Sequence, residues 1–239
     1  MKSIVIQGVP FLQFEHITLP SLFHVFTFKQ PFLNPGDDEE RERLKVILSI
    51  DTLCTASQMH GTHWVVVDEP LQEKPVADAL LTARKGMYLG VLVADCFPIL
   101  LVDPVKEALA VVHAGWKGVM GAIHLEVLQA MHTVFGSRVS DLLVGVGPGI
   151  GGCCFEVKED VAQLFVGRGA KRIQEKEGRF FIDLSGIVQD ELEACGVMKK
   201  NIEQSGLCTR CHGEMFHSFR REGRLSGRNM LLAGWRKRD

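Results

Sequence analysis

The chain contains short, almost uninterrupted apolar runs that end at turn-forming residues. Residues 87–94, 99–102 and 108–113 are the clearest of these runs, and Asp103-Pro104 ends the second one. A short apolar run between turn signals is typical of a strand that is buried on both faces of a sheet. We therefore predict core strands over these ranges.

Helical periodicity alternates with the strand-like runs. Apolar residues recur at helical spacing over residues 117–136, with Gly136 as the expected stop, and a charged helix is expected after the Pro35-Gly36 turn. The further expected elements are strands over 141–146 and 180–184 and helices over 157–165 and 187–194. Alternating elements predict an α/β layered fold, and because no repeat or linker interrupts them we expect residues 1–239 to form a single domain.

Composition and charge narrow the classes of function. The chain has 239 residues, of which 46% are hydrophobic and 23% charged, so it can bury a sizeable core. A net charge of −2 and a pI near 6.5 provide no basic surface for phosphate backbones, so nucleic acid is not an expected partner. No segment reaches the ~18 consecutive apolar residues of a membrane span, and we expect no membrane association.

The cysteines indicate a reducing compartment. Seven is an odd number, and a chain of this length does not need disulfides for stability, so we expect free thiols in the cytoplasm. Cys208 and Cys211 have the spacing of a metal-binding or redox pair. Because no second pair that would complete a four-ligand site is recognisable, we expect these two thiols to be unligated.

Three polar residues fall at the ends of expected elements rather than on exposed faces. They are His60, Cys96 and His113, and strand ends are where loops of α/β folds converge on a crevice. Two imidazoles and one thiolate suit a tetrahedral Zn(II) site whose fourth position stays open for water or substrate. Spacing alone favours the alternative, in which Cys96 is a small buried side chain and the histidines are hydrogen-bonded neighbours.

Several segments in order along the chain resemble one family of proteins. They are 58-QMHG-61, 94-ADCFPILLVDP-104, 113-HAGWKG-118, 147-GPGIGGCCFEV-157, 205-SGLCT-209, 216-FHSFRREG-223 and 227-GR-228. These segments are similar to the successive blocks of the YfiH-like family, which has been called laccase-domain or polyphenol oxidase and more recently purine nucleoside phosphorylase. The resemblance covers most of the chain.

The resemblance implies a fold, an activity and a metal site. The fold would be a three-layer α/β/α domain with a mixed sheet. The activity would be phosphorolysis of purine nucleosides such as adenosine, inosine and methylthioadenosine, with possible deamination of adenosine. The metal, Zn(II) or else copper, would be held by His60, Cys96 and His113. Purine nucleoside and phosphate would then be the partners, and no protein partner can be inferred.

The same resemblance suggests residues around the metal. Asp95 would be its neighbour and would orient a ligand or a substrate group. Lys117 and Arg228 are candidate phosphate holders together with Arg220 and Arg221, although any of them can equally be a solvated surface charge. The glycine-rich segment 145–152 would supply backbone N–H groups to phosphate or simply form a tight turn.

Other classes of function remain open. A cysteine hydrolase would use Cys96 as nucleophile and His113 as base without metal, and peptidoglycan precursors would suit such an amide-cleaving thiol. A non-enzymatic binding protein would have a closed four-ligand site, completed by His63. Multicopper oxidation is not expected, because none of the nine histidines forms a His-X-His pair.

The chain departs from the family pattern at a few positions. Lys117 stands where arginine is usual, which keeps the charge but loses the planar two-point contact. Gly152 replaces a usual proline and Phe155 a usual tyrosine. The segment 24–40 lacks the usual Arg-Gly-Gly loop and Ser-Leu-Asn stretch, so no substrate contact is assigned to it.

Overall fold

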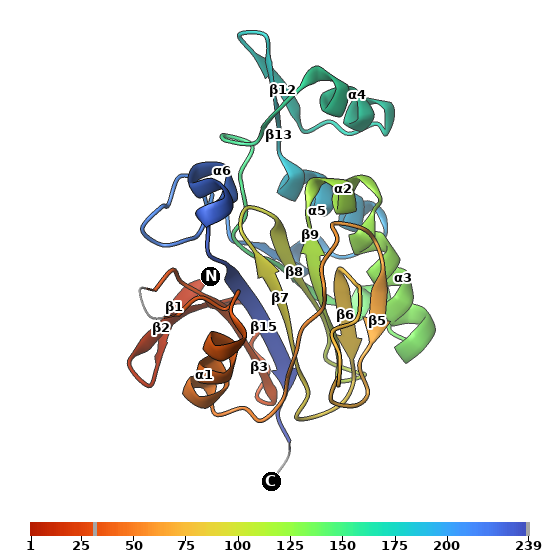
Figure 1. Cartoon of the computed structure of the whole chain (residues 1–239). Helices are drawn as coiled ribbons and strands as arrows, with labels where there is room; N and C mark the ends of the chain where they lie inside the picture. Colours follow the sequence, from red (N-terminus) through yellow and green to blue (C-terminus); the bar gives the residue numbers. More distant parts are fainter. Residues whose placement is uncertain (31–32, 238–239) are drawn as a thin grey trace.

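A computed structural model describes residues 1–30 and 33–237 of the chain (Figure 1). The strands are β1 Lys2–Ile6, β2 Val9–Gln13, β3 Leu22–Thr27, β4 Leu53–Cys54, β5 Trp64–Val66, β6 Ala79–Thr82, β7 Tyr88–Val93, β8 Phe97–Asp103, β9 Ala108–Ala114, β10 Leu143–Val146, β11 Glu156–Val157, β12 Ile173–Lys176, β13 Arg179–Ile182, β14 Ile202–Gln204 and β15 Asn229–Trp235. The helices are α1 Asp38–Leu48, α2 Trp116–Met120, α3 Ile123–Phe135, α4 Glu159–Gly167, α5 Leu184–Ala194 and α6 Phe219–Glu222. The strands predicted over 87–94, 99–102 and 108–113 are confirmed as β7, β8 and β9.

One six-stranded sheet joins the two ends of the described chain. Its order is β1-β2-β3-β15-β7-β4, and all neighbours are antiparallel except β4 and β7. The C-terminal strand β15 lies between β3 and β7 in the middle of this sheet (Figure 1). We call it the outer sheet.

A second six-stranded sheet carries the predicted core strands β8 and β9. Its order is β14-β10-β8-β9-β6-β5, with parallel pairs at both edges and antiparallel pairs between them. Strands β8 and β9 form its central hairpin, in which Pro98 pairs with His113. We call it the inner sheet.

The two sheets pack against each other, and helices cover their other faces (Figure 1). On β8, Leu100 and Val102 share a core with side chains of β7 and β15, whereas Ile99 and Leu101 share a core with α3 and α5. Leu44 of α1 packs on the far face of the outer sheet. The prediction of an α/β layered fold with mixed strand pairing is confirmed. Its strand layer is double because runs that are apolar on both faces need cover from helices on one side and from a second sheet on the other.

The helix predicted over 117–136 is two helices, so the expectation of one continuous helix is wrong. The chain turns between α2 and α3, where Ala122 has a left-handed backbone (φ 61°). Gly121 permits this turn, because a Cβ there would lie 2.5 Å from Thr62 Cγ2. Gly136 ends α3 with φ 68°, as predicted. No helix within residues 1–30 and 33–237 is long and apolar enough to cross a membrane.

A small three-stranded sheet and α4 project from the two large sheets (Figure 1). The sheet has the order β11-β13-β12, and both of its pairs are antiparallel. The segment 151–154 leads from the inner sheet into this projection. That segment also lies beside the functional site described below.

A buried histidine on β3 is expected to make folding stability depend on pH. His24 is 1% exposed, and its Nε2 accepts the backbone N–H of Phe14 at 3.1 Å. Burial lowers the pKa of His24 from 6.5 to about 4. Between these two values the unfolded chain binds a proton that the folded chain does not bind. The contribution of neutral His24 to folding stability is therefore fully present above pH 6.5 and is lost as the pH falls towards 4. The loss is roughly 2.5 kcal/mol between pH 7.5 and 4.5.

His24→Gln tests this dependence, because glutamine keeps an acceptor for Phe14 but does not titrate. Urea unfolding at pH 7.5 and 4.5 should show that the variant loses about 2 kcal/mol less than wild type between the two conditions. His16→Gln, at an exposed position, is the matched control and should behave as wild type. An equal pH dependence in wild type and His24→Gln would contradict the assignment.

Candidate metal centre

The structure brings together His60 from the connection before β5, Cys96 from the turn between β7 and β8, and His113 from β9. Their candidate ligand atoms all lie within 4.8 Å of one another. Cys96 Sγ is 3.8 Å from His60 Nδ1, and the two imidazole rings meet edge to face with centroids 4.7 Å apart. The three side chains proposed from the sequence therefore form one cluster.

Strand register explains why Cys96 and His113 meet. In the β8–β9 hairpin Phe97 pairs with Ala114 and Pro98 with His113, so Cys96, directly before β8, lies at the end where β9 finishes. Asp95, directly before Cys96, has φ 88°, which turns the chain between β7 and β8. The cluster thus lies where the central strands of the inner sheet end, as the sequence predicts.

A buried carboxylate that sequence reasoning missed organises the centre. Asp78 is 2% exposed and lies directly before β6. Its Oδ1 is 2.8 Å from Nδ1 of His113 and accepts the backbone N–H of His60 at 2.9 Å, while its Oδ2 accepts that of Gly61 at 2.7 Å. One side chain therefore holds two of the three candidate ligands, as outer carboxylates do in metal sites. The only sign of Asp78 in the sequence is that a single acid stands between two alanines just before an apolar run.

The charges within the cluster reinforce one another. Burial raises the pKa of Cys96, but hydrogen bonding and charge from His113 and His60 outweigh it and lower the value to about 7. Burial lowers the pKa of His113, but Asp78 and Cys96 together raise it to about 9. Burial also raises the pKa of Asp78, and hydrogen bonds from His113 and backbone N–H groups bring it below its ordinary value. Without metal the cluster thus favours a thiolate beside an imidazolium.

The centre opens onto a cavity of about 460 Å³. The three candidate ligands line one side. The other lining residues are Ala56, Gln58, Leu92, Ala94, Asp95, Ile150, Phe155, Phe219, Arg220 and Arg228. Apolar side chains, two arginines and the candidate metal centre thus line a single cavity.

The donor set fits a catalytic metal ion. Two imidazoles and a thiolate suit Zn(II), and the same donors also bind copper. His63 is exposed and lies outside the cluster that the described residues form, so the closed four-ligand site considered above is not found within residues 1–30 and 33–237. A metal ion held by these three residues would keep a fourth position for water or substrate from the cavity that they line.

The remaining site residues proposed from the sequence have different positions. Asp95 and Arg228 line the cavity, and Asp95 accepts hydrogen bonds from Thr209 Oγ1 at 2.7 Å and the backbone N–H of Arg220 at 2.6 Å. Lys117 does not line the cavity. It is exposed on α2, with Nζ 5.7 Å from the centroid of the Trp116 ring.

Arg220 and Arg221 also differ in their position relative to the cavity. Arg220 lines the cavity, where its guanidinium lies 5.6 Å from the centroid of the Phe155 ring. Arg221 instead donates to the carbonyl oxygens of Thr209 and Phe216, at 2.8 and 2.6 Å. Arg221 therefore links the backbone of residues 209 and 216, whereas Arg220 lines the cavity and its Nη1 donates to the carbonyl oxygen of Glu156 at 3.1 Å.

One known family matches the part of the chain that contains the candidate centre. The family described as multi-copper polyphenol oxidoreductase laccase matches residues 37–236, which include every residue of the centre. The chain belongs to this family. Among the described residues of this member, the groups that could hold a metal are the His60/Cys96/His113 cluster and a second cluster made of cysteines alone.

Individual relatives resemble the chain over about three quarters of its length or more. A purine nucleoside phosphorylase from Deinococcus radiodurans is 34% identical, with 97% of this chain and 95% of that protein covered. Adenosine deaminase RL5, from an unknown prokaryotic organism, is 35% identical over 76% of this chain and 74% of its own length. The crystal structure of YlmD from Geobacillus stearothermophilus matches with a TM-score of 0.84 at 28% identity, covering 91% of this chain and 93% of that one.

Proposed function

We propose that this protein is a metal-dependent purine nucleoside phosphorylase that cleaves adenosine, inosine and methylthioadenosine, with Zn(II) at His60, Cys96 and His113. The observation that carries the proposal is a three-donor centre that shares one cavity with two arginines. The relative named purine nucleoside phosphorylase, which aligns over 97% of this chain, supports the choice of reaction. Free thiols of this kind suit a reducing cytoplasm.

The cavity offers complementary surfaces to a nucleoside and a phosphate ion. Leu92, Ile150, Phe155 and Phe219 provide apolar contacts, of which the two rings can stack on a purine. Arg220 and Arg228 provide the positive charge that phosphate requires. A cavity of about 460 Å³ is within the range of small-molecule sites.

Phosphorolysis breaks the bond between the purine nitrogen and the ribose C1′ and forms a bond from C1′ to a phosphate oxygen. The electron pair of the broken bond leaves with the purine. Arg220 and Arg228 would hold the phosphate beside C1′, and Asp95 would fix the backbone of Arg220 through its 2.6 Å hydrogen bond. The apolar walls would orient the purine and exclude bulk water.

Asp78 would set which ring nitrogen of His113 carries a proton. Its contact with Nδ1 of His113 fixes that ring and leaves the other nitrogen for ligation. When bound, Zn(II) would supply Lewis acidity for charge that develops on the leaving purine, or for the attacking water in adenosine deamination. The relative named adenosine deaminase supports deamination as a second activity of the same centre.

A cysteine hydrolase is the second candidate function, and one observation favours it. The Cys96 thiol would be the nucleophile, His113 the base beside it, and Asp78 the acid that orients the base. Such an enzyme would cleave amides without metal. It would keep its activity after chelation, whereas the metal-dependent phosphorylase would lose it.

Product analysis tests the proposed reaction. Zinc-loaded protein is incubated with each of the three nucleosides, with and without phosphate, and free base and sugar 1-phosphate are measured by mass spectrometry. Phosphate-dependent formation of both products, absent after chelation and in Cys96→Ala, is the expected result. Folded, zinc-loaded protein that forms neither product would contradict the proposal, and amide cleavage that survives chelation would support the hydrolase.

The positions of two cations predict different effects on phosphate binding. Arg228→Met keeps an unbranched side chain, although a shorter one, and removes the charge from the cavity, so we expect the KM for phosphate to rise about tenfold. Lys117→Met removes a charge of the same sign outside the cavity and should change this KM less than about twofold. Steady-state kinetics with varied phosphate measures both. A larger effect of the Lys117 variant would contradict the placement of phosphate beside Arg228.

A further inference from the structure

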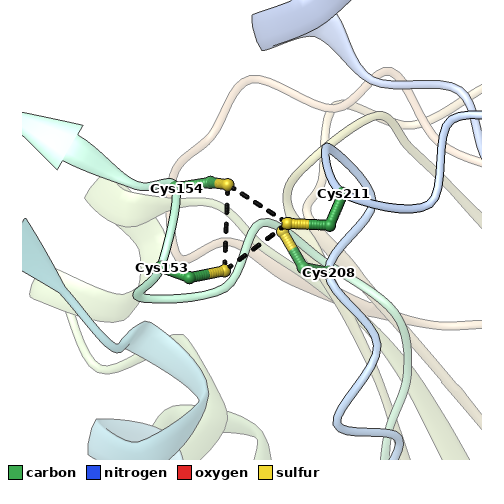
Figure 2. Close-up of side chains that lie close together, drawn as sticks. All are labelled: Cys153, Cys154, Cys208 and Cys211. Atoms are coloured by element: carbon green, nitrogen blue, oxygen red, sulfur yellow. Dashed lines mark hydrogen bonds between the residues drawn. The ribbon is translucent and has the colours of Figure 1, made fainter.

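Four cysteines form a second cluster beside the cavity wall (Figure 2). Cys153 and Cys154 lie in the segment before β11, and Cys208 and Cys211 lie in the segment after β14. Their sulfur atoms are all within 4.8 Å of one another and point towards a common centre. The expectation that no second pair completes a four-ligand set with Cys208 and Cys211 is therefore wrong, because chain folding supplies the pair.

The distances between the sulfurs fit a tetrahedral metal site. Around Zn(II), with Zn–S bonds of about 2.3 Å, the sulfurs of a regular tetrahedron are about 3.8 Å apart. The Sγ atoms of Cys153 and Cys154 are 3.7 Å apart. The Sγ atom of Cys211 lies 3.8 Å from that of Cys153 and 3.4 Å from that of Cys154. All seven cysteines are free, and an S–S bond would require about 2.05 Å.

Backbone groups around Cys208 give independent support. The N–H of Gly151 donates to Cys208 Sγ at 3.3 Å, and together with the backbone N–H groups of Arg210 and Cys211 it lowers the pKa of Cys208 against the effect of burial. Several N–H donors converging on one sulfur form a setting for a negatively charged acceptor, which is the state of a metal-bound cysteine. Two of these donors belong to the Cys208–Cys211 turn itself.

Exposure and nearby charge are also suitable for a metal ion. Cys154 and Cys208 are buried, whereas Cys153 and Cys211 are exposed, so an ion can reach the cluster from solvent. Cys153 and Cys208 also line a separate cavity of about 670 Å³, to which Lys171 and Lys176 contribute. These cations can partly balance the negative charge of a four-thiolate zinc site.

We propose that Cys153, Cys154, Cys208 and Cys211 bind one structural Zn(II) ion that fastens the segment 151–154 to the segment 208–211. Four protein ligands close the coordination sphere, which is the pattern of structural rather than catalytic zinc. This site does not depend on the reaction performed at His60, Cys96 and His113.

The fastened segments support the wall of the first cavity. Ile150 and Phe155, on either side of the first segment, line that cavity. Thr209, within the second segment, donates to Asp95 at 2.7 Å, and Asp95 precedes Cys96 in the chain. Zinc in the cysteine cluster would thus stabilise both sides of the substrate space without touching substrate.

Metal content and coordination test the proposal. Protein expressed and purified with zinc under reducing conditions is analysed by elemental mass spectrometry, as wild type and as Cys211→Ser, Cys153→Ser, Cys96→Ala and Cys195→Ser. Cys195 is exposed and outside both clusters, so Cys195→Ser is the matched control. We expect each cluster variant to lose about one zinc per chain relative to wild type and to the control. X-ray absorption at the zinc edge of Cys96→Ala should show sulfur ligands alone.

The outcomes separate this site from the first one. If zinc is absent from the His60/Cys96/His113 centre, Cys96→Ala will match wild type while Cys211→Ser still loses its zinc, which supports the cysteine site by itself. Equal zinc in Cys211→Ser and wild type would overturn the proposal. A chain mass two units below that of the reduced chain would also overturn it, because that difference marks a disulfide. Finding iron in place of zinc would overturn it as well. The absorption measurement on Cys96→Ala decides the question even where the serine variants fail to fold.

Discussion

Gly115→Ala is expected to remove metal from the His60/Cys96/His113 centre and to lower nucleoside cleavage at least about 100-fold, although it removes no ligand. A Cβ at this position would lie 2.8 Å from His60 Nδ1 and 3.0 Å from Cys96 Sγ. Both distances are too short for carbon, so at least one ligand must move. Displacement of a metal ligand by even a fraction of an ångström disturbs the coordination that the other residues hold.

The backbone itself should tolerate this change. Gly115 has φ −73° and ψ 168°, which alanine adopts readily, so the expected defect lies at the centre rather than in folding. Gly167→Ala, at the end of α4 where nothing lies within 4 Å of the added carbon, is the matched control. Zinc affinity by chelator competition, kcat/KM for inosine and urea unfolding should be compared. Unchanged zinc affinity in Gly115→Ala would show that the centre does not use His60 and Cys96 as placed here.

Asp78→Asn is expected to weaken zinc binding and catalysis by about 10- to 100-fold. The two oxygens of Asp78 contact Nδ1 of His113 and the backbone N–H groups of Met59, His60 and Gly61. Asparagine has only one acceptor oxygen, and its NH₂ group would face donors on the other side. Either His113 or the loop that carries His60 must then lose its partner.

Asp68→Asn provides the control for the loss of a negative charge, because Asp68 is exposed. It should leave zinc affinity and kcat/KM within about twofold of wild type. The informative quantity is zinc affinity measured beside the free energy of unfolding of the zinc-free protein. A variant of Asp78 that loses only stability and binds zinc as tightly as wild type would show that Asp78 supports the fold without positioning ligands.

Much of the secondary structure could be predicted from local pattern. The apolar runs of β7, β8 and β9 and the charged helix α1 were recognisable, because burial on both faces and helical periodicity are written into neighbouring residues. The split between α2 and α3 was not, since apolar periodicity continues through Ala122 while its left-handed backbone interrupts the helix. The outer sheet was also missed, because β15 pairs with β3 from near the opposite end of the chain and with β7, which is also far away in sequence.

The candidate centre shows the same division. His60, Cys96 and His113 could be proposed from their positions at strand ends and from the blocks that contain them. Asp78 could not, because one acid before an apolar run has no local signal of its contacts with His113 and His60. Sequence alone also could not place Lys117 outside the cavity.

The order of residues along the chain specifies which positions are apolar, where strands and helices are favoured, and which side chains can act as metal ligands. Which of these side chains meet depends on how the whole chain packs. The β8–β9 register sets Cys96 beside His113, and the approach of two distant segments turns Cys153, Cys154, Cys208 and Cys211 into one cluster. The physical reason is that periodicity and turn chemistry depend on neighbours in the chain, whereas strand register and loop contacts depend on the packing of the whole core.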